Sequence, residues 1–329
     1  MGKPVRMADI AERLEISVVS VSKALAGKPG VSEETRGKVL ALARELGYAS
    51  GRSGGETTGN LGVLVSDRFF YENAFYSNLY RSVVLASGGE GLGCMIEIVS
   101  REAERTCARP ALAAGRKVDG LIFMGNLAPA YLRAAAGEGL PCLALDFHAP
   151  GAGLDCVTGN NLEGGFVLAE HLLAQGVREI GFLGSILATS SIMERYLGYQ
   201  YALRTAGLVP REDWRLEDRD GSGAFVPPAL PETLPRAFLC SCDEAAYHLV
   251  EALRRRGLRV PEDVAVCGYD DFRFATLCQP GLTSYHVDVD RMASAAVALL
   301  TRRIRQEDAP SIVCTVPGRL VVRDSTRVR

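Results

Sequence analysis

Apolar residues near the start of the chain recur every three or four positions, a spacing typical of amphipathic helices. Between residues 5 and 48 this spacing predicts three short helices and a turn, with buried positions at Ile10, Leu14 and Ile16, at Val21, Ala24 and Leu25, and at Val39, Leu42, Ala43 and Leu46. Ser17 and Ser32 stand where N-caps belong, and Gly47 stands where a C-cap belongs. We therefore predict a small helical domain at residues 1–49.

A polar segment, SGRSGGETTGN at residues 50–60, follows this domain. It contains four glycines and no large apolar residue. Such a composition is typical of a flexible linker, so we place a domain boundary here.

From residue 61 onward, short apolar runs alternate with stretches of helical periodicity. The apolar runs lie at 61–66, 94–99, 118–124, 141–146, 179–185, 237–241 and 264–270, and helical stretches include 161–175, 191–207 and 243–257. This alternation predicts an α/β fold with parallel strands covered by helices on both faces. Ligands bind such sheets beyond the carboxyl ends of the strands. The polar residues at those ends are therefore candidates for binding: Asp67, Asn126, Asp146, Ser185, Asp243 and Asp270.

Residues 6–26 read as a helix, a tight turn and a second helix, an arrangement that can lay the second helix in the major groove of DNA. Val18, Val19 and Lys23 lie opposite the apolar face of that helix, where valines suit thymine methyl groups and lysine suits guanine acceptors or phosphate. Further candidates for DNA contact, mainly with phosphates, are Ser17, Ser20, Ser22, Lys28, Thr35 and Arg36. The same spacing also fits a helical docking module whose valines are buried in a partner protein.

The run MADIAERLEISVVSVSKALAGKPGVSEETRGKVLALARELGY resembles the head of the LacI/GalR family of bacterial regulators. The chain departs from the family at Glu15, where the family usually has Gly in the turn. A left-handed backbone there would cost a residue other than Gly about 1 kcal/mol.

The resemblance extends through the rest of the chain, in segments such as VDGLIFMGN, LPCLALD, NNLEGGFVLAEHLLAQGVREIGFLGS and CDEAAYHLVEALRRRGLRVPEDVAVCGYDD. It implies a three-helix helix-turn-helix head followed by two doubly wound parallel-sheet lobes, similar to periplasmic sugar-binding proteins. The implied crossings between the lobes lie near 158–161, 285–289 and 316–320. Lobe 1 would then hold about 61–158 and 289–317, and lobe 2 about 161–285 and 319–329.

The resemblance also assigns an effector site between the lobes. Asp146, Arg195 and Asp270 match the family's polar effector contacts, and Phe75 and Tyr76 match its aromatic wall. Such a set fits a sugar, because carboxylates and a guanidinium bond its hydroxyls while an aromatic face packs on its ring. Cys242 occupies a position where the family commonly has Asn, and His148 is a candidate replacement. Without the resemblance, the aspartates could cap strand ends and Arg195 could be a helix-surface charge.

Composition restricts the alternatives. Among 329 residues, 47 % are hydrophobic and 23 % are charged, with a net charge of −2 that divides into +2 over residues 1–60 and −4 over the rest. The nine cysteines fit buried thiols in a reducing compartment, and the close pair Cys240 and Cys242 is predicted on one face of a strand. No signal peptide, membrane-spanning run or enzyme motif is evident. The run GGEGLG at 88–93 reads as the end of a helix and a turn. The histidines at 171 and 248 read as structural. We expect a cytoplasmic protein that is not an enzyme, with no cofactor, no metal and no membrane partner.

Together these observations predict a homodimeric transcription regulator, in the first instance a repressor. It would bind a double-stranded DNA operator and respond to a small-molecule effector, a sugar by the family resemblance, with a dimer contact that includes residues 76–87. The alternative is a cytoplasmic sugar-binding or sensing protein whose head does not read DNA. The linker lacks the leucine that the family wedges into the operator, so we predict that it stays non-helical on DNA and bends the operator little.

Overall fold

The computed structural model describes residues 7–25, 30–46, 57–70, 74–137, 139–221, 223–305 and 309–327. The chain forms two compact units, divided between Thr57 and Thr58.

The smaller unit contains the three predicted helices, α1 (Met7–Arg13), α2 (Val18–Leu25) and α3 (Glu33–Glu45). Their apolar faces meet in one small core of Ile10, Ala11, Val21, Ala24, Val39 and Ala43. The two predicted N-caps are confirmed, since the hydroxyl oxygens of Ser17 and Ser32 accept hydrogen bonds from the backbone N–H groups of Ser20 (3.0 Å) and Thr35 (3.2 Å). Gly47 lies outside the described residues.

The turn after α1 adopts the left-handed backbone expected at Glu15, whose φ is +53°. The N–H of Glu15 donates to the carbonyl of Glu12, and the N–H of Ile16 donates to the carbonyl of Ala11. These two bonds form a Schellman motif, which usually has Gly at the left-handed position. Glu15 therefore carries backbone strain that the hydrogen bonds of the turn hold in place.

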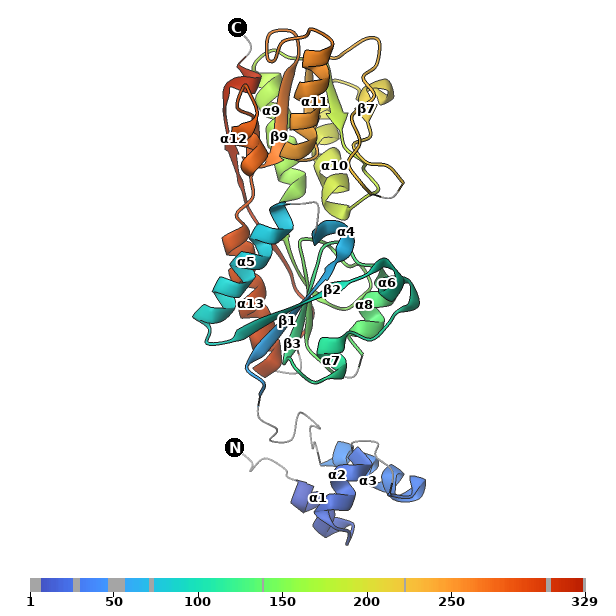
Figure 1. Ribbon diagram of the computed structural model, residues 1–329. Helices are drawn as coiled ribbons and strands as arrows, with labels where there is room; N and C mark the ends of the chain where they lie inside the picture. The colour runs from blue at the N-terminus through green and yellow to red at the C-terminus, as the bar shows by residue number, and fades with distance from the viewer. Residues whose placement is uncertain are drawn as a thin grey trace. The chain divides into compact units, whose positions relative to one another are not determined.

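The larger unit has two lobes, each built on a six-stranded sheet (Figure 1). The sheet of lobe 1 has the order β11-β5-β4-β3-β1-β2, with all neighbours parallel. Its strands are β1 (Asn60–Ser66), β2 (Gly93–Val99), β3 (Gly120–Met124), β4 (Cys142–Leu145), β5 (Asp155–Gly159) and β11 (Val313–Val316). The central strands β1, β3 and β4 are almost entirely apolar because both of their faces are covered.

Helices cover the two faces of this sheet. Val63 and Val65 of β1 pack into a cluster with α5 and α13, whereas Leu64 packs into a cluster with α7 and α8. The helices of this lobe are α4 (Asp67–Phe70), α5 (Ala74–Gly89), α6 (Arg101–Thr106), α7 (Ala111–Ala114), α8 (Pro129–Ala135) and α13 (Val289–Arg305). The glycine-rich run at 88–93 is the predicted helix end and turn, because α5 ends at Gly89, Gly91 has a positive φ and β2 begins at Gly93.

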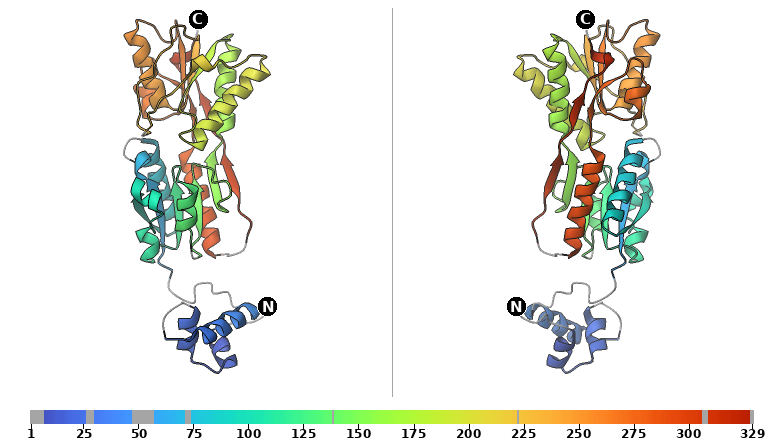
Figure 2. Two further views of the ribbon diagram at one scale, coloured as in Figure 1. Left: turned by 90° about the vertical axis from the view of Figure 1, so that its right-hand side faces the viewer. Right: turned by 90° about the vertical axis from the view of Figure 1, so that its left-hand side faces the viewer.

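The sheet of lobe 2 has the order β12-β10-β9-β8-β6-β7, parallel except for the edge strand β12. Its strands are β6 (Ile180–Leu183), β7 (Arg215–Leu216), β8 (Ala237–Cys240), β9 (Ala265–Asp270), β10 (Thr283–His286) and β12 (Arg319–Val321). Its helices are α9 (Asn161–Ala174), α10 (Ser190–Thr205), α11 (Asp243–Arg255), α12 (Arg273–Leu277) and the short 3-10 turns Glu212–Trp214 and Asp324–Thr326. Of these, α9 and α10 cover one face and α11 the other, as the two side views show (Figure 2).

The chain passes between the lobes three times. It crosses after β5, after β10 and after β11, and each crossing leads directly into α9, α13 or β12. Gly159 pairs with Val316, and His286 pairs with Arg319. The three crossings therefore lie side by side, as three adjacent strands of backbone between the lobes.

One prediction about the strands is wrong. β8 ends at Cys240, and Cys242 is instead the N-cap of α11, where its sulfur accepts a hydrogen bond from the N–H of Ala245. The two cysteines consequently do not share the face of a strand. His171 and His248 do lie in helices, where His171 bonds the hydroxyl of Thr326 and His248 contacts the ring of Tyr247. In the described part of the chain, no helix is both long and apolar enough to span a membrane.

Candidate functional sites

A cleft that is partly open to solvent lies between the two lobes, and its empty space, open solvent included, is about 390 Å³. Lobe 1 contributes Phe75, Tyr76 and Asp146 to its wall. Lobe 2 contributes Thr189, Ser191, Ile192 and Arg195 from the start of α10 and its cap, together with Arg219, Ser241, Cys242 and Asp270 near the ends of strands. The cavity therefore lies where a doubly wound sheet usually places a ligand, beyond the carboxyl ends of its strands.

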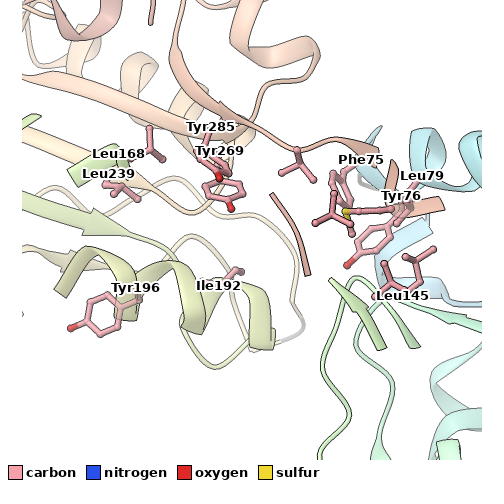
Figure 3. Packing of buried hydrophobic residues seen from close by; sticks show 14 of the residues in the cluster. Phe75, Tyr76, Leu79, Leu145, Leu168, Ile192, Tyr196, Leu239, Tyr269 and Tyr285 are labelled. Atoms are coloured by element: carbon pink, nitrogen blue, oxygen red, sulfur yellow. The ribbon is translucent and has the colours of Figure 1, made fainter. Parts of the chain in front are cut away.

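On the lobe 1 side, the wall consists of two aromatic rings and one carboxylate. Tyr76 donates its hydroxyl to the Oδ2 atom of Asp146 at 2.8 Å. Phe75 packs edge-on against Tyr76, and Figure 3 shows both rings beside Leu79 and Leu145 in the core of lobe 1. Asp146 itself has a φ of +70°, an uncommon conformation for an aspartate at the end of a strand.

On the lobe 2 side, Arg195 is buried and held by four neighbours. Its Nε donates to Oδ1 of Asn161 at 3.0 Å, and its Nη1 donates to the carbonyl of Ser241 at 2.6 Å. Its Nη2 lies 3.5 Å from Oδ1 of Asp270, and its guanidinium lies 3.7 Å from the centre of the Tyr269 ring. Arg195 is therefore not a helix-surface charge but a fixed donor at the wall of the cavity.

Burial raises the pKa of both aspartates of the cavity. The pKa of Asp146 rises from 3.8 to about 6 and that of Asp270 rises to about 7, in each case because desolvation outweighs the attraction of Arg195. Such perturbed pairs in a cleft are typical of binding or catalytic sites. The aspartates can accept hydrogen bonds as carboxylates and can donate one when protonated.

The head unit presents a different kind of surface. Val21 and Ala24 of α2 are buried, whereas Val18 and Val19 are 45 % and 63 % exposed. Two exposed valines in succession are unfavourable in water, so this face of α2 is suited to contact with another molecule. Lys23 and Ser22 are exposed on the same helix.

Known proteins resemble this chain both in the unit that contains α2 and in the unit that contains the cavity. Residues 6–50 match the family described as bacterial regulatory proteins of the lacI family, and residues 169–326 match the periplasmic binding protein-like domain. The transcriptional repressor PurR of Pasteurella multocida (strain Pm70) is 26 % identical over 331 residues, covering 98 % of each chain. This chain belongs to the LacI family of bacterial regulatory proteins.

Solved structures of the family superpose on almost the whole chain. The transcriptional regulator CelR in complex with cellobiose matches with a TM-score of 0.69 at 26 % identity, over 98 % of this chain and 99 % of the other. The lac repressor dimer bound to operator and to the anti-inducer ONPF matches with a TM-score of 0.66 at 25 % identity and the same coverage. The protein is thus a DNA-binding transcription regulator with an effector-binding domain.

The structure brings all six residues predicted for the effector site of this LacI-family regulator to the same cavity: Phe75, Tyr76, Asp146, Arg195, Cys242 and Asp270. His148 is exposed and lies outside the cavity wall, although its backbone N–H donates to Ser190 across the lobes at 3.4 Å. Whether the six residues contact an effector stays a prediction.

The residues predicted for DNA contact differ in the hydrogen bonds that they make within the head. Ser17 and Ser20 share a hydrogen bond at the start of α2. Thr35 bonds Ser32, while Arg36 donates to the carbonyl of Ala24 and so holds the end of α2. Lys28 lies outside the described residues. Among the described members of the predicted set, the exposed ones are Ser17, Val18, Val19, Ser22 and Lys23.

Sequence reasoning missed five residues of the cavity wall: Thr189, Ser191, Ile192, Arg219 and Ser241. Arg219 follows the short strand β7 in an irregular segment, where no pattern distinguishes it. Thr189 could have been found as a helix N-cap, since its hydroxyl accepts from the N–H of Ile192. Among the strand-end residues, Ser185 bonds Asp218 rather than facing this cavity.

Proposed function

We propose that this LacI-family regulator is a cytoplasmic repressor, which binds a roughly palindromic operator as a homodimer and is controlled by a sugar held between the lobes. The observation that carries the ligand assignment is the cavity wall itself. Asp146 and Asp270 supply acceptors, Arg195 supplies a donor that is already fixed, and Phe75 and Tyr76 supply aromatic surface. This combination suits a ring that has hydroxyl groups on its rim and apolar faces.

The exposed face of α2 supports the DNA-binding part of the proposal. Val18 and Val19 would contact base methyl groups in the major groove, and Lys23 would donate to guanine or to a phosphate. Ser17, Ser20, Ser22, Lys28, Thr35 and Arg36 would contribute contacts that position the head on the DNA.

Apolar residues on lobe 1 support a dimer. Helix α5 exposes Val84 and Leu85, which are 38 % and 61 % exposed, and the neighbouring edge strand β2 exposes Ile98 at 38 %. An exposed strand edge beside an apolar helix face favours association with a second copy, and a two-fold dimer matches a palindromic operator.

Control by the effector follows from the position of the cavity between the lobes. Each lobe contributes charged groups to it, so a ligand that contacts both lobes binds one arrangement of them better than another. That difference in affinity is the free energy available to change the affinity of the protein for DNA.

A gel-shift titration with DNA from upstream of the gene for this chain tests the proposal. We expect the full-length protein to retard this DNA in preference to a scrambled fragment, and a sugar from a panel of mono- and disaccharides to change the affinity. A protein that binds sugar but retards both fragments equally would instead be a sugar sensor without DNA readout. A response only to ligands other than sugars, such as nucleobases, would overturn the sugar assignment alone.

A further inference from the structure

Four exposed basic side chains lie at one end of lobe 1. Arg116 and Lys117 belong to the loop between α7 and β3, and Arg302 and Arg305 belong to the last turn of α13. None of the four forms an ion pair with another described residue. They therefore present positive charge to the solvent and do not hold the fold together. We call these four side chains the basic edge.

The packing of lobe 1 places both halves of the basic edge at the same end of the sheet. A Cβ atom on Gly120, the first residue of β3, would lie 3.0 Å from Cδ1 of Leu300, so the last turns of α13 cover the start of this strand. Lys117 lies two residues before Asp119, whose N–H donates to the carbonyl of Asn60, the first residue of β1, at 2.8 Å. Figure 1 shows the start of β1, α7 and the end of α13 at this end of lobe 1.

Most of the acidic residues described at this end are engaged within the fold. Asp119 is buried and accepts from two backbone N–H groups where the chain enters lobe 1, at 2.8 Å and 3.1 Å. Asp155 is bonded to Arg303 at 2.6 Å and 2.7 Å. Glu90 is exposed and precedes β2, the outermost strand of the sheet. Residues 61–329 carry a net charge of −4, yet the described residues of this end present four exposed cations and one exposed carboxylate.

Arg116 has a backbone conformation that residues other than Gly rarely adopt. Its φ is +49°, and it occupies the left-handed position of a Schellman motif that ends α7. In this motif the N–H of Lys117 donates to the carbonyl of Leu112 at 3.1 Å, and the N–H of Arg116 donates to the carbonyl of Ala113 at 3.2 Å. Backbone strain of this kind is often kept at functional sites, and here the strained residue carries an exposed charge.

We propose that the basic edge is a second DNA-binding surface, which contacts the phosphate backbone of DNA that the head holds. This inference rests on the proposed DNA-binding function and adds to it a contact made by the core. A duplex presents phosphates at regular spacing, so it can pair with several separated cations and release the counterions bound to it. Because the head and the core belong to one chain, DNA bound by the head meets the core at a high effective concentration.

Contacts with phosphates can be distinguished from the reading of bases. They strengthen binding to the operator and to unrelated DNA alike, because the backbone carries no sequence information. Each such contact also makes binding more sensitive to salt, by about one unit in the slope of the logarithm of affinity against the logarithm of salt concentration. The basic edge should therefore raise affinity and salt sensitivity while leaving the preference for the operator unchanged.

Fluorescence anisotropy of labelled duplexes with the full-length protein measures both properties. The probes are DNA from upstream of the gene for this chain and a scrambled fragment of equal length, each titrated at several salt concentrations without effector. The test variant combines Lys117→Gln, Arg302→Gln and Arg305→Gln. We expect its salt slope to fall by about 2 to 3 on both duplexes. Its affinity at about 0.1 M salt should fall at least about tenfold, by the same factor on both.

A matched control variant makes the same change of charge on lobe 2. It combines Arg178→Gln, Arg204→Gln and Arg255→Gln, which remove three exposed arginines that form no ion pair with another described residue. Test and control variants have the same net charge, so their comparison separates the basic edge from charge in general. Arg116→Gly relieves the strained turn and should by itself lower the salt slope by about 1. Melting curves verify that every variant is folded.

The outcomes separate the basic edge from the proposed function. If the wild type binds DNA and the test variant keeps its affinity and salt slope, the basic edge does not bind DNA and the proposed function stands. The same conclusion follows if the control variant loses as much affinity as the test variant. A loss confined to the operator would also overturn the phosphate contact, because that contact is blind to sequence. If the wild-type protein binds neither duplex, the proposed DNA-binding function and the basic edge both fall.

Discussion

Replacing Asp270 by Asn should make the core less sensitive to pH. Asp270 is buried, and its pKa of about 7 means that the folded protein binds a proton there far more tightly than the unfolded chain, whose pKa is near 3.8. Stability from this group is fully present below the unfolded pKa and is lost as the pH rises through the folded pKa. The contribution of Asp270 to the stability of the core therefore grows as the pH falls from neutrality toward 5.

The magnitude follows from linkage. For a carboxyl with a folded pKa of about 7 and an unfolded pKa of 3.8, the gain between about pH 7.5 and about pH 5.5 is about 2 kcal/mol. Asp146, with a pKa of about 6, acts in the same direction by a smaller amount over that interval. Asn keeps the shape of Asp and tolerates the positive φ at residue 270, so the variant removes the proton-binding group without new backbone strain.

Urea denaturation of the full-length protein at the two pH values measures the effect. The single tryptophan, Trp214, is buried in lobe 2, so its fluorescence reports on the core rather than on the head. The difference between the two pH values should be about 2 kcal/mol smaller in Asp270→Asn than in the wild type. Asp213→Asn is the control, because Asp213 is exposed and Arg211 lowers its pKa, away from this interval. Equal pH dependence of wild type and Asp270→Asn would refute the assignment of a buried, proton-binding carboxyl at this position.

Four further predictions concern the head, the cavity and the linker. Lys23→Ala should weaken operator binding by about 1–3 kcal/mol without changing effector affinity, and equal operator affinity in a gel shift would contradict the placement of α2 in the groove. Arg195→Ala should abolish effector binding in calorimetry, because the main fixed donor of the cavity is lost, while operator binding without effector should survive. A mutant that titrates like the wild type would contradict this role of Arg195. Glu15→Gly should stabilise the head by about 1 kcal/mol, seen as slower hydrogen exchange of α1 and α2 in the full-length protein, and unchanged exchange would show that the left-handed turn is not strained. The linker at residues 49–60 should leave the bound operator nearly straight in a bending assay. Most of this linker lies outside the described residues. A sharp central kink in the operator would show the prediction to be wrong.

Local patterns in the sequence were sufficient for the head. Each helix of the head is specified by apolar positions three or four residues apart, and the caps at Ser17 and Ser32 act on N–H groups three residues away. The left-handed turn at Glu15 is local in the same sense, because its two hydrogen bonds join residues at most five positions apart. Interactions over such short separations can be read from the order of residues alone.

The α/β class of the core was also readable, because buried parallel strands must be continuously apolar. Five strands were not readable in this way. β5, β10 and β11 mix polar residues with apolar ones, and β7 and β12 are only two or three residues long, so they carry no period. The position of Cys242 was also misjudged, because β8 ends at Cys240 and Cys242 is the N-cap of α11.

Only the tertiary structure decided how the residues of the cavity are joined by hydrogen bonds and how deeply they are buried. Tyr76 and Asp146 are 70 residues apart, and Arg195 and Ser241 are 46 apart, yet each pair is joined by a hydrogen bond. The resemblance to the LacI family named these residues, but the burial that raises the pKa of both aspartates depends on two lobes closing over them. The place of Arg219 in the cavity wall had no signal in the sequence, because desolvation and shape depend on which distant segments pack together and not on the residues next along the chain.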